Sequence, residues 1–252
     1  IVAASAALSI GGTVGVGASI GAALATNLIG FTEGGTRQGA EVQAYIKDSN
    51  VIDADALEIN ALSDLAVNAV VLAGSVAIAG GTVGVGLAGA GASSENRIAA
   101  DVRAYIDGDG ASGITVDSLT VNADDTSFIN ADTGAASVAA SFGAVGASVS
   151  VGLALAENEI DNMVEAYIKN AADLTTSVGG VTVTADETAE IEALTAAASA
   201  AVSVSIGGSA SVALTKAENT LTSTVAAYIQ ASDQVQSAGA VLVSANDRST
   251  IS

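Results

Sequence analysis

The sequence predicts an all-β protein, an elongated parallel β-helix (solenoid) built from four repeats of about 61 residues. The four tyrosines all lie in an Ala-Tyr-Ile tripeptide and are 60, 62 and 61 residues apart, so the chain is a repeat array: Tyr45, Tyr105, Tyr167 and Tyr228. Bulky and small residues alternate over long stretches, which favours strands over helices. With only seven Phe and Tyr residues, no Trp and no Pro, the core must consist of small and β-branched side chains, which suit thin stacked layers.

The repeats lie at residues 1–62, 63–129, 130–190 and 191–252. Each starts from a long uncharged stretch that ends in an Asn, continues to the Tyr tripeptide, and includes a short alternating strand such as Val181–Ala185. The Asn and the Tyr are nine residues apart in the last three repeats and 18 apart in the first. This difference places an insertion near residues 30–39, which we expect to bulge outward without changing the coil.

The uncharged stretches are predicted strands with one bulky face and one small face, as in Val149–Leu155. Because β-helix coils commonly take on the order of 20 residues, a repeat is most simply about three coils, and one wide coil is the alternative. The face of Ser, Gly and Ala has two readings. It either invites lateral packing of another rod, or it is covered within its own coil, which would make each unit two layers thick.

Acidic or polar pairs follow each Val-x-Val-type strand, and we interpret them as turns. Carboxylates that recur at turns could share calcium, which takes six to eight oxygen ligands. The calcium candidates are Asp64, Asp124, Asp125, Asp186, Glu187 and Asp247. The sequence motifs of calcium β-rolls and EF-hands are absent, so solvated turns are the favoured interpretation and no other cofactor is predicted.

Two further recurring features have a structural and a binding interpretation. A row of tyrosines could form a platform for sugar rings, but packing at an edge of the coil with wet hydroxyls is favoured. The Asn that ends each uncharged stretch follows Glu95, Glu157 or Glu218 in three repeats. We expect this Asn to hydrogen-bond turn backbone, with the Glu at the same corner.

Composition excludes several function classes. The absence of Cys and His removes disulfides, thiol metal sites and the usual general base. A net charge of −20 opposes nucleic-acid binding. The uncharged runs are long enough for a membrane helix but lack basic flanks and aromatic belts, so no membrane insertion is predicted, and a membrane β-barrel is a lower-ranked alternative. The seven basic residues are scattered, which argues against an enzyme, including a polysaccharide-active β-helix enzyme.

The order of a Gly/Ala/Ser/Val run, a Glu-Asn pair, an Ala-Tyr-Ile strand and a Val-x-Val-x-Ala strand resembles the repeats of giant secreted bacterial adhesins. These are the filamentous-haemagglutinin and fusobacterial leukotoxin-like filamentous proteins. The resemblance implies a right-handed parallel β-helix, an extracellular or cell-surface location in a Gram-negative bacterium, and no catalytic residues.

The predicted function is therefore a non-catalytic structural or adhesive segment that forms a rod or filament, and a glycan-binding β-solenoid module is the alternative. We expect the chain to be an uncapped slice of a longer protein. The expected partners are other copies, joined end to end or laterally, and glycans or proteins of host or neighbouring cell surfaces.

Overall fold

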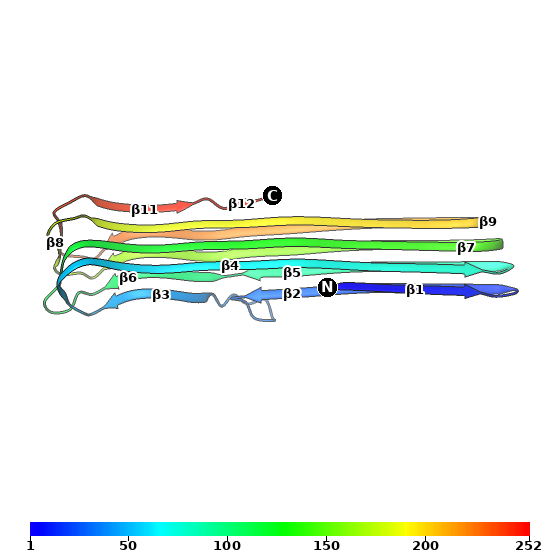
Figure 1. Ribbon diagram of the computed structural model, residues 1–252, viewed down its shortest axis with the longest axis horizontal. Helices are drawn as coiled ribbons and strands as arrows, with labels where there is room; N and C mark the ends of the chain where they lie inside the picture. Colours follow the sequence, from blue (N-terminus) through cyan, green and yellow to red (C-terminus); the bar gives the residue numbers. More distant parts are fainter.

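The computed structural model describes residues 1–252, and the chain folds into parallel strands without a helix (Figure 1). It therefore contains no helix with the length and apolarity needed to cross a membrane. The strands are β1 (Val2–Ile10), β2 (Val14–Ile29), β3 (Ala40–Lys47), β4 (Val51–Gly80), β5 (Val83–Ile98), β6 (Ala100–Asp107), β7 (Ile114–Lys169), β8 (Leu174–Thr176), β9 (Val181–Gln230), β10 (Val235–Ser237), β11 (Val241–Asp247) and β12 (Thr250–Ile251). The predicted all-β class with parallel pairing is confirmed.

Each strand pairs with the equivalent strand of the next sequence repeat. Leu57 pairs with Leu119, and Leu119 pairs with Val181, so the partners are 62 residues apart. The chain thus returns to the same lateral position once per repeat, and we call one such passage a winding. The expectation of about three short coils per repeat is wrong, and the alternative of one wide coil is correct. The acidic pairs interpreted as turns lie inside β4, β7, β9 and β11, because the alternation of inward and outward side chains continues through them.

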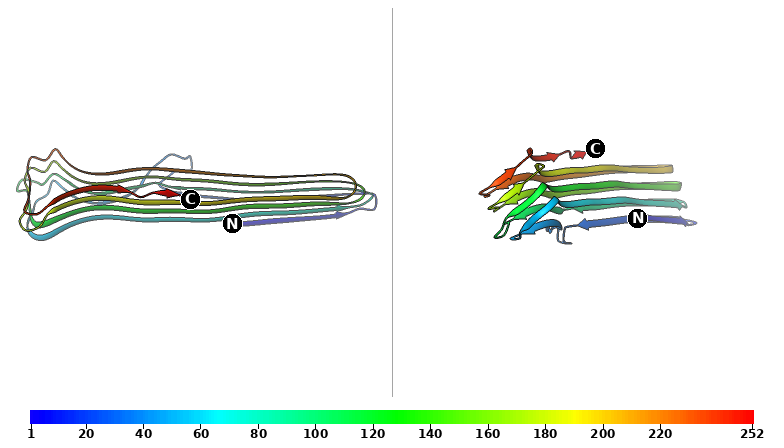
Figure 2. Two further views of the ribbon diagram at one scale, coloured as in Figure 1. Left: turned by 90° about the horizontal axis from the view of Figure 1, so that it is seen from above. Right: turned by 60° about the vertical axis from the view of Figure 1, so that its left-hand side comes forward.

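A winding is long and narrow (Figure 2). An outgoing strand such as Leu119–Phe142 reaches a sharp turn, which we call the tip, and a return strand such as Val145–Lys169 leads back. The opposite end, the root, closes through loops and the short strands β8 and β10. The half of the molecule toward the tip, the blade, comprises the four runs that contain no charged side chain: residues 1–25, 66–94, 133–156 and 193–215.

The interior changes in character from root to tip. The root encloses the largest core, which contains fully buried Ile106, Ile114 and Leu174. Beyond Val67, Val71 and Thr133, which are buried at the root side of the blade, the blade interior holds Ala, Ser and Gly between its two sheets, as at Ser137 and Ser150, whose hydroxyls hydrogen-bond at 2.7 Å. The small-residue faces are therefore covered within their own winding, which makes the blade two layers thick. The alternative in which they form an open surface for another rod is wrong.

Glycine allows the two sheets to approach this closely. A Cβ atom at Gly17 would lie 2.6 Å from the carbonyl oxygen of Ile78 in the opposite sheet, and one at Gly86 would lie 2.6 Å from that of Ala140. Neither gap admits a methyl group, so glycine is required where backbone meets backbone.

The insertion leaves the ladders on either side of it in register. β2 pairs with β5 up to Ile29 and Ile98, and β3 resumes the pairing at Ala40 and Ala100. Residues 30–39 form an outward loop closed by a bridge between Phe31 and Arg37. The expectation that the insertion bulges without changing the coil is confirmed.

Candidate functional site

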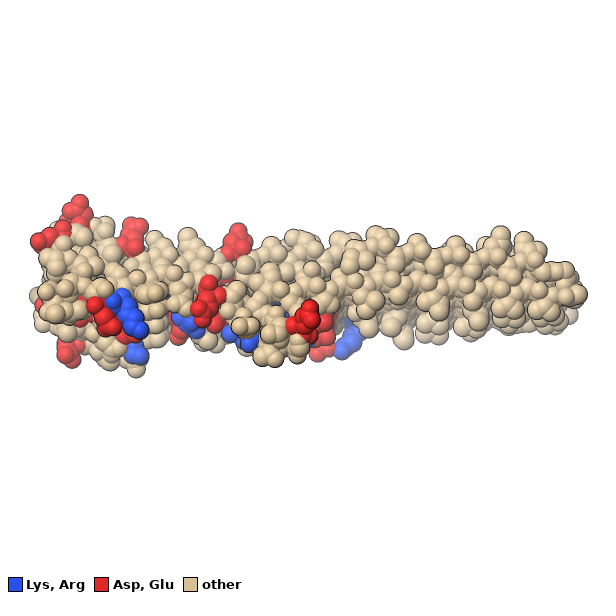
Figure 3. All heavy atoms as spheres, turned by 90° about the horizontal axis from the view of Figure 1, so that it is seen from below, with Lys and Arg blue, Asp and Glu red and all other residues tan.

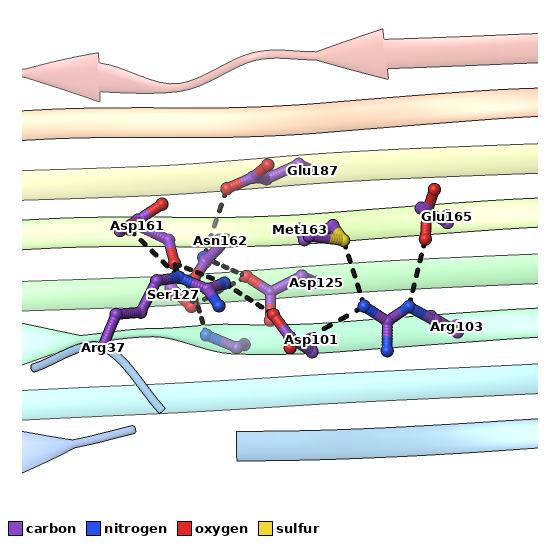
Figure 4. Close-up of polar contacts among 11 residues, drawn as sticks. Arg37, Asp101, Arg103, Asp125, Ser127, Asp161, Asn162, Met163, Glu165 and Glu187 are labelled. Atoms are coloured by element: carbon purple, nitrogen blue, oxygen red, sulfur yellow. Dashed lines mark hydrogen bonds and ion pairs between the residues drawn. The ribbon is translucent and has the colours of Figure 1, made fainter. Parts of the chain in front are cut away.

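A buried acid–amide cluster lies where the root meets the blade, and it consists of Asp125, Ser127, Asn162, Glu187 and Ser223. Figure 4 shows the first four of these side chains. Asp125 and Glu187 are ladder neighbours in adjacent outgoing strands, and Asn162 and Ser223 face them from the return strands. The Asn162 amide donates to Asp125 Oδ2 at 2.8 Å and to Glu187 Oε1 at 3.2 Å. It also accepts a hydrogen bond from the backbone N–H of Ala100 at 2.9 Å. One amide thus connects three windings.

The two carboxyl groups of this cluster are destabilised in their ionised forms. Neither residue is exposed to solvent, and Asp125 Oδ1 and Glu187 Oε2 have no hydrogen-bond partner. Burial raises the pKa of Glu187 to about 7, although hydrogen bonds from Ser223 and Asn162 oppose the shift. Burial also raises the pKa of Asp125, against the hydrogen bond from Ser127. Glu187 is therefore only about half ionised at neutral pH and is protonated below it.

The calcium candidates do not form one site, because adjacent residues of a strand point to opposite faces. Asp125 and Glu187 point inward and are fully buried, whereas Asp64 and Asp124 are exposed. Asp186 also points outward and accepts a hydrogen bond from Asn246 at 2.8 Å. Asp247 pairs with Glu187 in the last winding, where no further strand covers it, and it is exposed. No group of three or more acidic side chains is close enough to hold a metal ion.

The insertion loop makes an ion-pair network on the outside of the root half. Arg37 Nη2 lies 2.5 Å from Asp101 Oδ1, and Arg37 Nε lies 3.0 Å from Asp161 Oδ2. Asp101 belongs to β6 and Asp161 to β7, so the loop of the first repeat is tied to the two following windings (Figure 4). Arg97 adds a contact to the same loop, with its guanidinium carbon 5.8 Å from the centre of the Phe31 ring.

The tyrosines stack on one another along the rod. Ring centres of successive tyrosines are 4.8 to 5.0 Å apart and the rings are within 9° of parallel. They occupy equivalent positions, as the repeat array implies, because Tyr105 pairs with Tyr167 and Tyr167 pairs with Tyr228. Because neighbouring rings cover one another's faces, only ring edges and the outer faces of Tyr45 and Tyr228 remain for a sugar ring.

The recurring asparagines form a ladder rather than caps for turns. Each side-chain amide donates to the next asparagine oxygen at 2.8 Å, through Asn27, Asn96, Asn158 and Asn219. All four lie inside long strands and point inward, so the expected bond to turn backbone is wrong. The adjacent Glu95 and Glu157 point to the opposite face and pair with Arg97 outside.

Comparison with known proteins adds no relative. No protein-family model matches the chain, and neither a curated protein sequence nor a solved structure matches it. The resemblance to filamentous adhesins rests on the repeat pattern alone.

Sequence reasoning missed Asn162, Ser127, Ser223 and Arg37 as partners of the acidic residues. Asn162 could have been found, since it lies four residues after Asn158 and therefore on the same inward face of one strand. Arg37 could not, because no pattern indicates where a loop without a counterpart in the other repeats will lie.

Proposed function

We propose that the chain is a non-catalytic shaft segment of a large extracellular bacterial repeat protein, shaped as a right-handed β-solenoid with one winding for each of its four repeats. Its task is to extend a rod and hold it rigid. The resemblance of the repeats to those of filamentous adhesins supports the location, and the general preference of parallel crossovers supports the handedness.

The observation that carries this proposal is the unbroken register of the ladders. Between Leu119 and Lys169, β7 pairs with β9 with only one irregularity, at Phe142/Val145. Interior and exterior residues both repeat at the spacing of neighbouring strands, as the asparagine ladder and the tyrosine stack do. Such a structure grows by adding windings, each of which contacts only its neighbours, as a shaft requires.

Tandem copies test the shaft. Ser252 follows Ile251, which pairs with Ile191, so Ser252 stands beside Glu192 in the ladder. The ladders place Ile1 in the same row as Thr195, so two residues are needed between copies to fill positions 193 and 194. An Ala-Leu junction copied from positions 193–194 keeps the register. Electron microscopy should then show rods that lengthen by about 19 Å per copy, from four windings at roughly 4.8 Å each.

A junction of a single Ala is the matched control. It shifts the register by one residue and turns every inward side chain of the second copy outward at the joint. We expect the in-phase tandem to be one straight rod and the control to bend at the joint. In-phase tandems that behave as separate, flexibly joined particles would contradict the proposal.

A further inference from the structure

The blade exposes its large apolar side chains and buries its small ones. On β7, the inward residues of the return strand are Ser148, Ser150 and Gly152, and they are fully or almost fully covered. The outward residues between them are Val149, 41% exposed, and Val151, 41% exposed. Figure 3 shows charged side chains over the root half of one face and none toward the tip. A solvated sheet face would be polar here, so this surface has the composition of an interface.

We call the outward side of the four return strands in the blade the return face, which consists of residues 14–25, 83–94, 145–156 and 206–215. Its ladders place Val14, Val83, Val145 and Ile206 in one row. Larger and smaller residues alternate within other rows, such as Ile20, Gly89 and Val151. The small residues leave shallow apolar hollows, one of them lined by Ile20, Leu87 and Val149. The face therefore has both projecting side chains and gaps to receive them.

We propose that the return face binds the return face of a second copy of this chain. Its area is sufficient for a dimer. Twelve residues at roughly 3.3 Å span about 40 Å, and four strands at roughly 4.8 Å span about 19 Å. The resulting area of about 750 Å² per copy is close to the roughly 800 Å² per partner that stable complexes bury.

Spacing and charge favour a second copy and define its orientation. A second copy presents ridges at the same strand spacing, so the two sets of side chains can interdigitate along the rod. The net charge of −20 is carried by the root half, because the blade has no charged side chain. A two-fold axis parallel to the rod places the tip of each blade against the root side of the other and keeps the acidic halves apart. Every added winding then extends the contact.

Single cysteines test this arrangement, because the chain has no cysteine of its own. Val151 lies in the middle of the return face and Val145 lies at the tip. Under mild oxidation, Val151→Cys should form a disulfide-linked dimer, because position 151 faces its own copy across the two-fold axis. Val145→Cys should not, because its counterpart lies at the far end of the partner's blade. Equal cross-linking of the two variants, or none in Val151→Cys, would overturn the proposed packing.

Charge variants test the face itself by sedimentation of the whole chain. The double variant Leu87→Glu/Val151→Glu places charges at positions 42% and 41% exposed on the return face. The matched control Val76→Glu/Val138→Glu uses positions 39% and 41% exposed on the outgoing face. We expect a dimer for the wild type and the control and a monomer for the return-face variant, with unchanged circular dichroism for all three. A monomeric wild type that sediments with phosphatidylcholine vesicles, and loses this binding in the return-face variant, would overturn the proposal in favour of a lipid surface.

Discussion

The side-chain amide of Asn96 donates a hydrogen bond to the side-chain oxygen of Asn158, 2.8 Å away in the next winding. Asn158 repeats the same bond to Asn219. Asn96 and Asn158 are at most 1% exposed, so water cannot reach their side-chain amides, and each amide satisfies the hydrogen-bonding groups of its neighbour instead. The ladder fixes the register between windings, because a shift by one residue would place these amides outside.

Replacing Asn158 by Ala should destabilise the protein by about 2–5 kcal/mol, because it leaves both the Asn96 amide and the Asn219 oxygen without a partner. Urea unfolding measures the loss. Asn130→Ala is the control, since Asn130 lies on the outward side of the outgoing part of β7, and we expect a change within about 0.5 kcal/mol. Equal effects of the two substitutions would show that the ladder does not hold the windings.

Stability should fall as pH rises from 4.5 to 7. The pKa of Glu187 is about 7 in the folded protein against an ordinary 4.5, so in this window the folded state binds a proton that the unfolded state has lost. Asp125 and Asp247 face Glu187, and both raise its pKa further. The loss amounts to on the order of 3 kcal/mol.

Glu187→Gln isolates this effect, because glutamine keeps the shape of the protonated acid and cannot ionise. The difference in unfolding free energy between variant and wild type should grow in favour of the variant between pH 4.5 and 8. Parallel stability curves for the two proteins would show that Glu187 titrates normally in the folded state.

Ala231→Gly should stabilise the protein by about 0.5–1 kcal/mol. Ala231 has φ of 50°, and the equivalent positions in the other windings are Asp48, Gly108 and Asn170, residue types that tolerate this left-handed conformation. Thermal unfolding gives the measurement. Ala227→Gly, near the end of β9, should instead lower the melting temperature, since glycine weakens a strand that has no need of positive φ.

Arg37→Ala should cost about 1–2 kcal/mol, because Arg37 is partly buried and neutralises both Asp101 and Asp161. The loss should shrink in high salt. Arg248→Ala is the matched control, with a side chain 61% exposed and a single ion pair at 3.5 Å, and it should change stability by less than about 0.5 kcal/mol. If Arg37→Ala is equally silent, the ion pairs of Arg37 do not stabilise the protein.

The repeat spacing and the alternation were enough to predict parallel strands and the equivalent placement of the tyrosines. They did not predict the width of a winding, because a polar pair such as Asp124 and Asp125 has the composition of a turn. The strand continues because the buried carboxylate of Asp125 accepts hydrogen bonds from Ser127 and Asn162. The bond from Asn162 comes from the facing strand, so the local sequence does not show it.

The alternation also did not predict which face of each blade strand is buried. Val149 and Val151 would ordinarily be expected inside and Ser148 and Ser150 outside. The structure places them the other way round, because two sheets in near backbone contact have room only for Gly, Ala and Ser. Periodicity shows that two faces differ, and only the opposing sheet decides which one is buried.

The distance between spin labels at the tip and at the root of one winding tests the central claim, a single wide winding per repeat, most directly. Thr82→Cys and Ala111→Cys place labels at two exposed turns, with β5 and β6 between them. The 25 residues from 83 to 107 span about 80 Å at roughly 3.3 Å each. Pulsed electron paramagnetic resonance should therefore give a distance near 80 Å. A distance below about 30 Å, as short coils of about 20 residues would give, would contradict it.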